Sequence, residues 1–158
     1  MVQGFKCFKK GLINRYGMIF ELGKVYHDDK EIKFHQSGFH MCTNLEDTLR
    51  YFDAFNEEVD IASVIGSGKI NKYDDEYNGF YDMYSVEYLQ VCHVLTRDEI
   101  MNYVLDLPPM RVKRFISLYK LSKEELLIFY DKYYNNIPIT NALNYYQNEK
   151  EKVYIKKK

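Results

Sequence analysis

A glutamate inside an apolar stretch is the first residue whose chemistry needs an explanation. Glu87 lies within residues 85–95, which have the most strand-like pattern in the chain. Alternation along a strand puts Ser85, Glu87 and Leu89 on one face. An acid among apolar neighbours must lie at an edge, find a partner or serve a function, because burying an unpaired charge is costly. The common interpretation is an edge-strand acid that prevents pairing with other chains, and the alternative is a catalytic acid.

Cysteine and histidine side chains form a second group that could do chemistry. The predicted strands carry Cys7, His40, Cys42, Cys92 and His93. Zinc ligands usually come in closely spaced pairs, but Cys92 and His93 point to opposite faces of a strand. We therefore predict no metal site and interpret Cys7 and Cys92 as small buried hydrophobes. A Cys–His nucleophile stays formally open, because Cys42 precedes a predicted helix start that could lower its thiol pKa.

Cations alternate with aromatic side chains after residue 110. Such interleaving could follow a nucleic-acid backbone and stack bases. It is also typical of an amphipathic helical cap whose aromatic side chains pack inward. We favour the cap, because nucleic-acid binding usually needs a larger charge excess. The candidate binding residues are Arg111, Lys113, Arg114 and Tyr119, together with Tyr77 and Tyr81 from an acidic, tyrosine-rich loop.

Charge is unevenly distributed along the chain. Its 158 residues include 22 Lys and Arg and 23 Asp and Glu, a net charge of −1. Residues 1–107 have a net charge of −7, whereas residues 108–158 have a net charge of +6. All eight glycines come before residue 80, and all three prolines come after residue 107. We therefore predict an α+β module at 1–107 and a basic helical appendage at 108–158, with a frayed C-terminus.

The composition excludes some classes of protein. No stretch reaches the roughly 18 apolar residues that a membrane helix needs. Three cysteines far apart in the sequence are not a disulfide framework, so we expect a reducing compartment such as the cytoplasm. The length suffices for a real hydrophobic core. The prediction is a soluble globular protein without a membrane partner.

Local patterns in residues 1–107 predict a small, mostly antiparallel sheet with one or two packed helices, followed by a C-terminal helical segment. The predicted strands are residues 4–8, 18–22, 24–26, 39–42, 59–70 and 85–95. Three pairs have capping-box spacing and predict helix starts: Thr43 with Glu46, Thr96 with Glu99, and Ser122 with Glu125. Residues 71–84 are predicted as an exposed loop or hairpin tip, and a further helix is expected over 140–149.

Three short motifs then resemble a known but uncharacterised small domain. They are GFK-x-F at residues 4–8, F-E-x-G-K-x-Y at 20–26 and G-F-H-x-C at 38–42. The resemblance covers about residues 3–100 and is to a domain of bacteriophages, large DNA viruses and some bacteria. It implies an organisation and a viral or phage source, and no established activity.

The order of motifs is also faintly similar to the core of mono-ADP-ribosyltransferases. In those enzymes a glutamate on a late strand contacts the ribose of NAD, and the resemblance implies this role for Glu87. Lys6 stands where these enzymes usually have an Arg or His, and His40 stands where they have a Tyr or Ser. Likeness of this kind does not by itself carry function.

Two hypotheses of function follow. The first is a non-catalytic accessory protein, viral or phage, that binds a host or viral macromolecule through the α+β module and the basic appendage. A protein partner is favoured, and a nucleic acid is possible through 108–158. The alternative is an ADP-ribosyltransferase-like enzyme that uses NAD, with Glu87, His40 and Lys6 as its site. Under the first hypothesis we expect no cofactor. We also expect the protein to lie in the cytoplasm, or in the cytoplasm of the host if the protein is viral.

Overall fold

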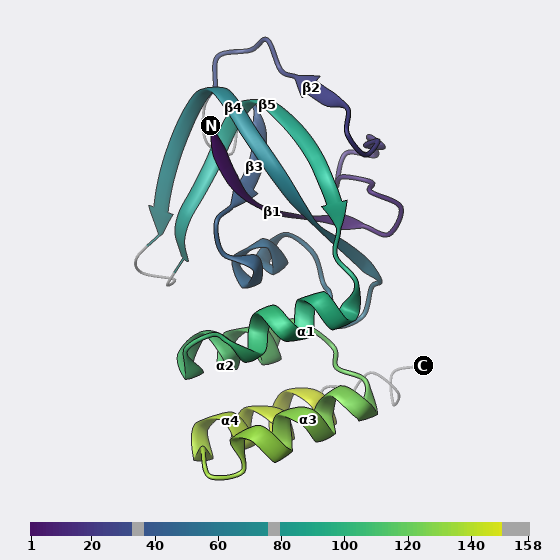
Figure 1. Cartoon of the computed structure of the whole chain (residues 1–158), viewed down its shortest axis with the longest axis vertical. Helices are drawn as coiled ribbons and strands as arrows, with labels where there is room; N and C mark the ends of the chain where they lie inside the picture. Colours follow the sequence, from purple (N-terminus) through teal and green to yellow (C-terminus); the bar gives the residue numbers. More distant parts are fainter. Residues whose placement is uncertain (33–36, 76–79, 150–158) are drawn as a thin grey trace. The chain divides into compact units, whose positions relative to one another are not determined.

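The computed structural model describes residues 1–32, 37–75 and 80–149. Two compact units make up the chain (Figure 1). The first unit is Met1–Asp53 with Glu57–Leu95, and the second is Ala54–Asn56 with Thr96–Lys158. The break in composition at Pro108 therefore lies inside the second unit.

A five-stranded antiparallel sheet forms the first unit. Its strands are β1 (Val2–Lys9), β2 (Val25–His27), β3 (Phe39–Cys42), β4 (Val59–Asp75) and β5 (Phe80–Val94). The order across the sheet is β2-β5-β3-β1-β4, and β4 also pairs with β5. That extra pairing makes the sheet curl back on itself, so that β5 has neighbours on both sides. The predicted α+β class with an antiparallel sheet is confirmed.

The strands differ from their predicted bounds in two places. Residues 18–22 were expected as a strand, but in this segment only Ile19 makes a bridge, with Ile13. Glycines with positive φ at Gly17 and Gly23 bend the chain on either side, which prevents a regular ladder. Residues 71–84 were expected as an exposed loop or hairpin tip; the paired strands β4 and β5 extend into this segment, to Asp75 and from Phe80, so it consists largely of strand and a hairpin replaces the loop.

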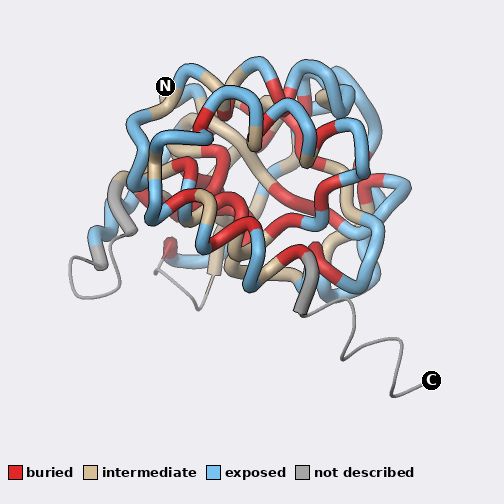
Figure 2. The backbone as a smooth tube through the Cα atoms, turned by 90° about the horizontal axis from the view of Figure 1, so that it is seen from below, coloured by how far each residue is buried: buried red, intermediate tan, exposed pale blue. Residues whose placement is uncertain are grey.

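Apolar side chains from all sides of the curled sheet fill its interior. Phe20 lies at the centre of an aromatic group, with ring centroids 5.2 Å from Phe8 and 4.6 Å from Tyr26. The buried core cluster comprises Phe8, Leu12, Phe20, Met41, Ala62, Val64, Val86, Leu89 and Val91. Buried and exposed stretches alternate along the backbone (Figure 2), as elements that each bury one face require.

A short helix follows β3 and differs from the sequence expectation. The 3₁₀ helix η1 (Leu45–Tyr51) begins after Asn44, and no side chain caps it. The predicted capping box of Thr43 and Glu46 is therefore wrong. The reason is the helix start: the N-cap is Asn44, so the residue three positions later is Asp47, whose carboxylate accepts a hydrogen bond from the Asn44 side chain at 3.2 Å.

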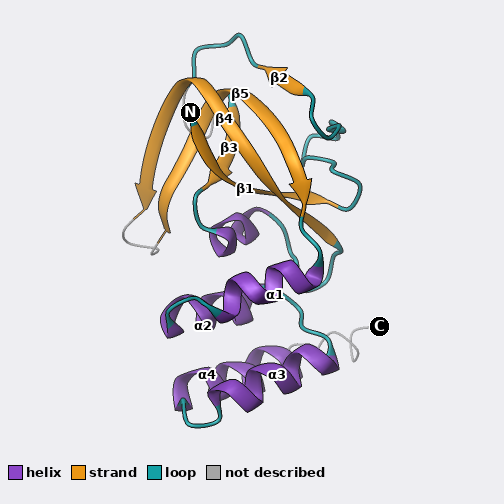
Figure 3. Cartoon of the chain, in the orientation of Figure 1, coloured by secondary structure: helices purple, strands orange, loops and turns teal. Residues whose placement is uncertain are grey.

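The regular elements of the second unit are all helices in its described residues, joined by short loops (Figure 3). Its elements are α1 (Arg97–Leu105), α2 (Pro109–Leu118), α3 (Lys123–Tyr133), α4 (Ile137–Ala142) and the π-helix η2 (Leu143–Glu149). Both predicted capping boxes in this unit are confirmed, at Thr96 with Glu99 and at Ser122 with Glu125. The helix expected over 140–149 is divided between α4 and η2.

The helices of the second unit have no net charge. Residues 96–149 contain seven basic and seven acidic side chains, so the basic excess of the unit comes from residues 150–158. Among the described residues, no helix combines the length and apolar character needed to cross a bilayer.

Candidate functional site

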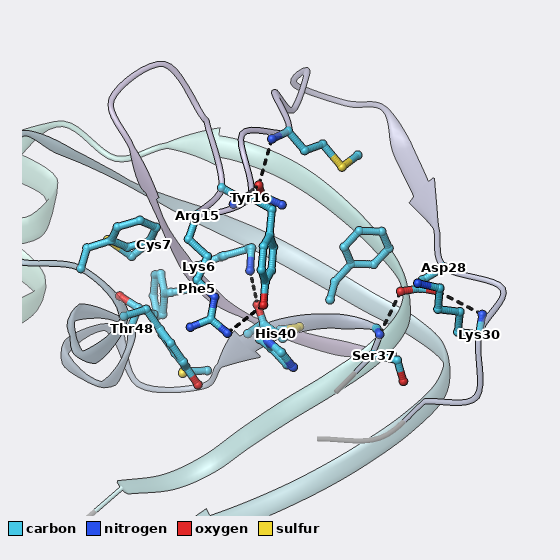
Figure 4. Close-up of a pocket in the computed structure, with 18 residues that line it drawn as sticks. Phe5, Lys6, Cys7, Arg15, Tyr16, Asp28, Lys30, Ser37, His40 and Thr48 are labelled. Carbon is cyan, nitrogen blue, oxygen red and sulfur yellow. Dashed lines mark hydrogen bonds between the residues drawn. The ribbon is translucent and has the colours of Figure 1, made fainter. Parts of the chain in front are cut away.

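A cavity of about 480 Å³ opens in the first unit beside β1, β3 and η1 (Figure 4). Its ionisable lining includes Lys6, Arg15, Asp28 and Lys30. The remaining lining residues are Phe5, Cys7, Asn14, Tyr16, Met18, Ser37, Gly38, Phe39, His40, Met41, Cys42, Thr48, Tyr51 and Phe52. A second hollow of about 440 Å³ has no charged lining residue, so the first cavity is the candidate site.

Lys6 brings an amine to this cavity from β1. Its Nζ donates a hydrogen bond to the backbone oxygen of His40 at 2.7 Å and lies 5.6 Å from the centroid of the Phe8 ring. Burial, with a smaller contribution from the positive charge of Arg15, lowers the pKa of Lys6 to about 8. A lysine in this state is partly deprotonated near neutral pH.

Arg15 comes from the loop between β1 and β2. The Oδ1 of Asn14 accepts hydrogen bonds from the backbone N–H groups of Tyr16 and Met18, both at 2.9 Å, and this shapes the loop. The Arg15 guanidinium donates to the Tyr16 hydroxyl at 3.0 Å and lies 5.1 Å from the centroid of that ring. The loop therefore holds a cation and an aromatic ring together at the cavity.

Tyr51 contributes a buried hydroxyl from the end of η1. Within the described residues this hydroxyl is buried and has no hydrogen-bond partner. Its ring is nearly parallel to that of His40, at 10° with centroids 6.5 Å apart. Burial raises the pKa of Tyr51 to about 12. The hydroxyl is therefore a neutral donor without an acceptor.

Asp28 is the acidic residue of the lining, and its oxygens are already engaged. They accept the backbone N–H of Lys30 at 3.0 Å and that of Gly38 at 2.9 Å. The hydrogen bond from Lys30 and then that from Gly38 hold the pKa of Asp28 below its ordinary value. Gly38 has φ of +80°, and a Cβ there would lie 2.8 Å from the Ser85 Oγ, so this turn requires glycine.

Glu87 does not line the cavity, unlike Lys6 and His40. Its Oε2 is hydrogen-bonded to His27 Nε2 at 3.0 Å, and its Oε1 accepts the backbone N–H of Lys69 at 3.0 Å. The Lys69 N–H and the His27 side chain lower the pKa of Glu87. Because β5 has paired neighbours on both sides, Glu87 is a partnered acid on an interior strand and not an edge acid.

The cysteines agree only in part with their predicted roles, and the burial of Cys7 is confirmed. Cys7 and Cys42 are buried free thiols, and burial raises the pKa of each to about 12. The suggestion that a helix start lowers the pKa of Cys42 is therefore wrong, because desolvation dominates there. Cys92 was expected to be buried and is exposed. Among the described residues, no three or more His, Cys, Asp or Glu side chains are grouped so that they could hold a metal ion.

The candidate binding residues after residue 110 are spread over α2 and the turn that follows it. Lys113 is exposed, Arg111 and Arg114 are partly buried, and Tyr119 is only 5% exposed. The Tyr119 hydroxyl accepts a hydrogen bond from Arg97 at 3.0 Å, so its ring is engaged inside the second unit. Tyr77 lies outside the described residues, and Tyr81 is described only as part of strand β5.

Sequence reasoning identified Lys6 and His40 as site residues but missed Arg15 and Tyr51. Only the Asn14-Arg15-Tyr16-Gly17 turn signal pointed to an ordered loop at that place. Nothing in the local sequence pattern connects Arg15, in a loop, with Tyr51, at the end of the later helix η1. The cavity as a whole offers three cations, one engaged carboxylate and aromatic walls.

Comparison with known families addresses the region that contains this cavity. Residues 2–79 match the model of a domain of unknown function, DUF7666. No curated protein and no solved structure matches the chain. The match confirms the resemblance to an uncharacterised domain in its coarse form. All of the cavity's lining residues fall inside the matched segment.

Proposed function

We propose that this chain is a non-catalytic binding protein, and that the cavity of its first unit receives an acidic segment of a protein partner. The observation that carries the proposal is a reversal of charge. The first unit has ten basic and fifteen acidic side chains, yet its cavity is lined by three cations and one acid. A positive recess in a negative surface selects anionic groups and repels most other basic surfaces.

Exposed apolar side chains beside the cavity support a macromolecular partner. Tyr16 and Met18 line the cavity and are 77% and 39% exposed. Ile19 and Leu22 follow in the same loop and are 63% and 57% exposed, and Val25, at the start of β2, is 56% exposed. Exposed apolar side chains of this kind are typical of protein-binding surfaces. The expected partner segment therefore combines acidic with apolar residues.

The ADP-ribosyltransferase alternative has less support. The observation that supports this alternative is that Lys6 and His40 line the same cavity. Against it, both carboxylate oxygens of Glu87 are engaged, by His27 and by the Lys69 backbone, and Glu87 is not part of the cavity lining. An acid that serves catalysis needs access to its substrate.

The second unit is proposed as an additional contact region. Arg111 and Arg114 remain candidates there, together with the exposed Lys113, whereas Tyr119 serves the interior of the unit. The proposal also includes a viral or phage source and a reducing compartment such as the host cytoplasm. The two buried free thiols, Cys7 and Cys42, are compatible with such a compartment.

A random-peptide display library panned against the full-length chain tests the proposal. We expect selected peptides to contain acidic residues next to apolar ones. Their affinity should fall at least about ten-fold in the Arg15→Ala/Tyr16→Ala double variant, because both side chains line the cavity. Lys10→Ala is the matched control: its side chain is 70% exposed and does not line the cavity, so this variant should bind normally. Selected peptides without an acidic bias, or with unchanged affinity for the double variant, would contradict the proposal.

A separate assay addresses catalysis. The full-length chain is incubated with labelled NAD and cell lysate, and transfer of the label to protein or nucleic acid is measured. We expect no transfer above that of Glu87→Gln. Transfer by the wild-type chain that Glu87→Gln abolishes would replace the binding proposal with the enzymatic one.

A further inference from the structure

We propose that Lys6 and Arg15 form an oxyanion subsite in this cavity, with the Tyr51 hydroxyl as a third donor, which takes a carboxylate or phosphate group of the bound partner. The inference rests on the proposed function and adds the chemistry of the group that enters the cavity. Three different elements supply the donors: β1, the loop before β2, and η1.

Two like charges meet here without a counter-ion from the lining. The positive charge of Arg15 is close enough to Lys6 to lower its pKa, which means that the two cations repel each other. The carboxylate of Asp28 already accepts two backbone N–H groups. Such an arrangement is destabilising when empty and becomes favourable when an anion lies between the cations.

Hydrogen-bonding capacity is also left over at these side chains. The structure gives the Lys6 amine one hydrogen bond, to the His40 carbonyl, although an ammonium group has three N–H donors. It gives the Arg15 guanidinium one, to the Tyr16 hydroxyl, although a guanidinium has five. A carboxylate or phosphate supplies several acceptors at once, and charge-assisted bonds of this kind are the strong ones.

The Tyr51 hydroxyl provides an independent observation. A buried hydroxyl without a partner is rare in folded proteins and usually indicates a missing water, ion or ligand. Arg15 acts electrostatically on both Lys6 and Tyr51, and Arg50 and Asp47 also act on Tyr51. Because Lys6, Arg15 and Tyr51 line the same cavity, an oxyanion held by Arg15 would enter the cavity whose wall contains the unsatisfied Tyr51 donor.

The walls of the cavity determine what the oxyanion is attached to. Phe5, Phe39 and Phe52 line it together with Tyr16. These aromatic side chains suit a ligand whose anionic group is joined to an apolar or aromatic body. Phenyl phosphate and phenylacetate are therefore suitable probes, since each joins a phenyl ring to one oxyanion.

The charge state of Lys6 makes the subsite sensitive to pH. Three groups interact electrostatically with Lys6: Cys7 on β1, Cys42 on β3, and Arg15. The other ionisable side chains that line the cavity are Tyr16, Asp28, Lys30, His40 and Tyr51. Both thiols stay neutral below pH 9, because burial raises their pKa to about 12. With the pKa of Lys6 at about 8, its protonated form, which binds anions, is lost as pH rises from 7 to 9.

Titration of the full-length chain by nuclear magnetic resonance tests the subsite. At pH 7 we expect each probe to cause saturable shifts of the Lys6, Arg15 and Tyr51 signals. Lys6→Met and Arg15→Met should each weaken binding about ten-fold, and Tyr51→Phe about three-fold. Lys10→Met, at an exposed lysine outside the cavity lining, should leave binding unchanged. Absence of saturable binding, or unchanged binding by Lys6→Met, would overturn the subsite.

The pH dependence provides a second measurement that a folding defect cannot imitate. Phenylacetate keeps its charge between pH 7 and 9, and its affinity for the wild-type chain should fall about ten-fold over this range. Lys6→Arg keeps its charge, so its affinity should stay constant. An equal decrease in Lys6→Arg would show that another group controls binding and would contradict the proposal.

The outcomes also separate the two proposals and the two sources of the anion. Stronger binding of phenyl phosphate assigns the subsite to phosphorylated partners, and stronger binding of phenylacetate assigns it to acidic side chains. If selected peptides bind but neither probe does, the subsite is wrong and the binding function stands. If both probes bind but panning selects no acidic peptide, the subsite stands and the proposed partner class is wrong.

Discussion

Lys6 illustrates how a single residue acquires its properties from its surroundings. In the sequence it is one of 22 basic residues and follows an ordinary strand pattern. In the folded chain its amine is held against the His40 carbonyl and near the Phe8 ring, where water is scarce. Desolvation disfavours its charged form, so folding stability and ionisation become linked at this residue.

The first prediction concerns the pH dependence of stability. The pKa of Lys6 is lowered from 10.5 to about 8 in the folded chain, so between these values the unfolded chain binds more protons. The free energy of unfolding should therefore rise with pH relative to Lys6→Met, by about 2–3 kcal/mol in total. Urea denaturation of both chains from pH 7 to 10.5 measures this difference. Parallel stability profiles for the two chains would show that Lys6 is not desolvated.

Among the elements, the connection between α1 and α3 depends on one polar cluster. Arg97 donates to Glu125 through Nε at 3.1 Å and Nη2 at 2.6 Å, and to the Tyr119 hydroxyl at 3.0 Å. Burial alone would raise the pKa of Glu125, but Arg97 and the Ser122 backbone N–H bring it below the ordinary value. Glu125 also completes the capping box of α3, so one carboxylate serves both the helix start and the packing between helices.

The second prediction is a loss of stability in acid that depends on this carboxylate. Because the pKa of Glu125 is lowered on folding, its contribution is present above pH 4.5 and is lost as pH falls through the folded value. Glu125→Gln should lower the free energy of unfolding by about 1–2 kcal/mol at pH 7 and by less at pH 3. The cost at pH 7 is modest because Arg97 is partly exposed, and solvent weakens its ion pair with Glu125. Urea denaturation at the two pH values measures this, with the exposed Glu124→Gln as the control. An equal cost at both values would assign the effect to capping geometry instead of charge.

At the scale of the whole molecule, the near-zero net charge is a sum of opposite contributions. The first unit has a net charge of −5, and residues 96–149 of the second are balanced. The positive excess of the second unit therefore belongs to residues 150–158, which contain five lysines and one glutamate. Any general attraction to polyanions should accordingly depend on this terminal segment and not on α2.

The third prediction tests this assignment with a single-stranded DNA oligonucleotide. Deleting residues 150–158 should remove most of the chain's weak affinity and lower the salt dependence of log K by about 3, because five lysines are lost. Fluorescence anisotropy at several salt concentrations measures both quantities. The Lys113→Ala/Arg114→Ala variant is the control and should change little. A larger effect in that variant than in the deletion would return nucleic-acid binding to α2.

The sequence by itself determined what depends on near neighbours. Thr96 with Glu99 and Ser122 with Glu125 start their helices as predicted, since a capping box needs only residues three apart. The α+β class and several strands also followed from local periodicity and turn residues. The same rule failed for Thr43 and Glu46, because the helix there begins after Asn44, one residue later than this pair requires.

Only the tertiary structure decided which distant residues meet. Glu87 is hydrogen-bonded to His27, sixty residues away, because β2 pairs with β5. The cavity likewise assembles Lys6, Arg15 and Tyr51 from a strand, a loop and a helix end. Such contacts depend on the register and curl of the sheet, which no local pattern encodes. The desolvation that lowers the pKa of Lys6 is a property of that assembly, so it too became apparent only in the folded chain.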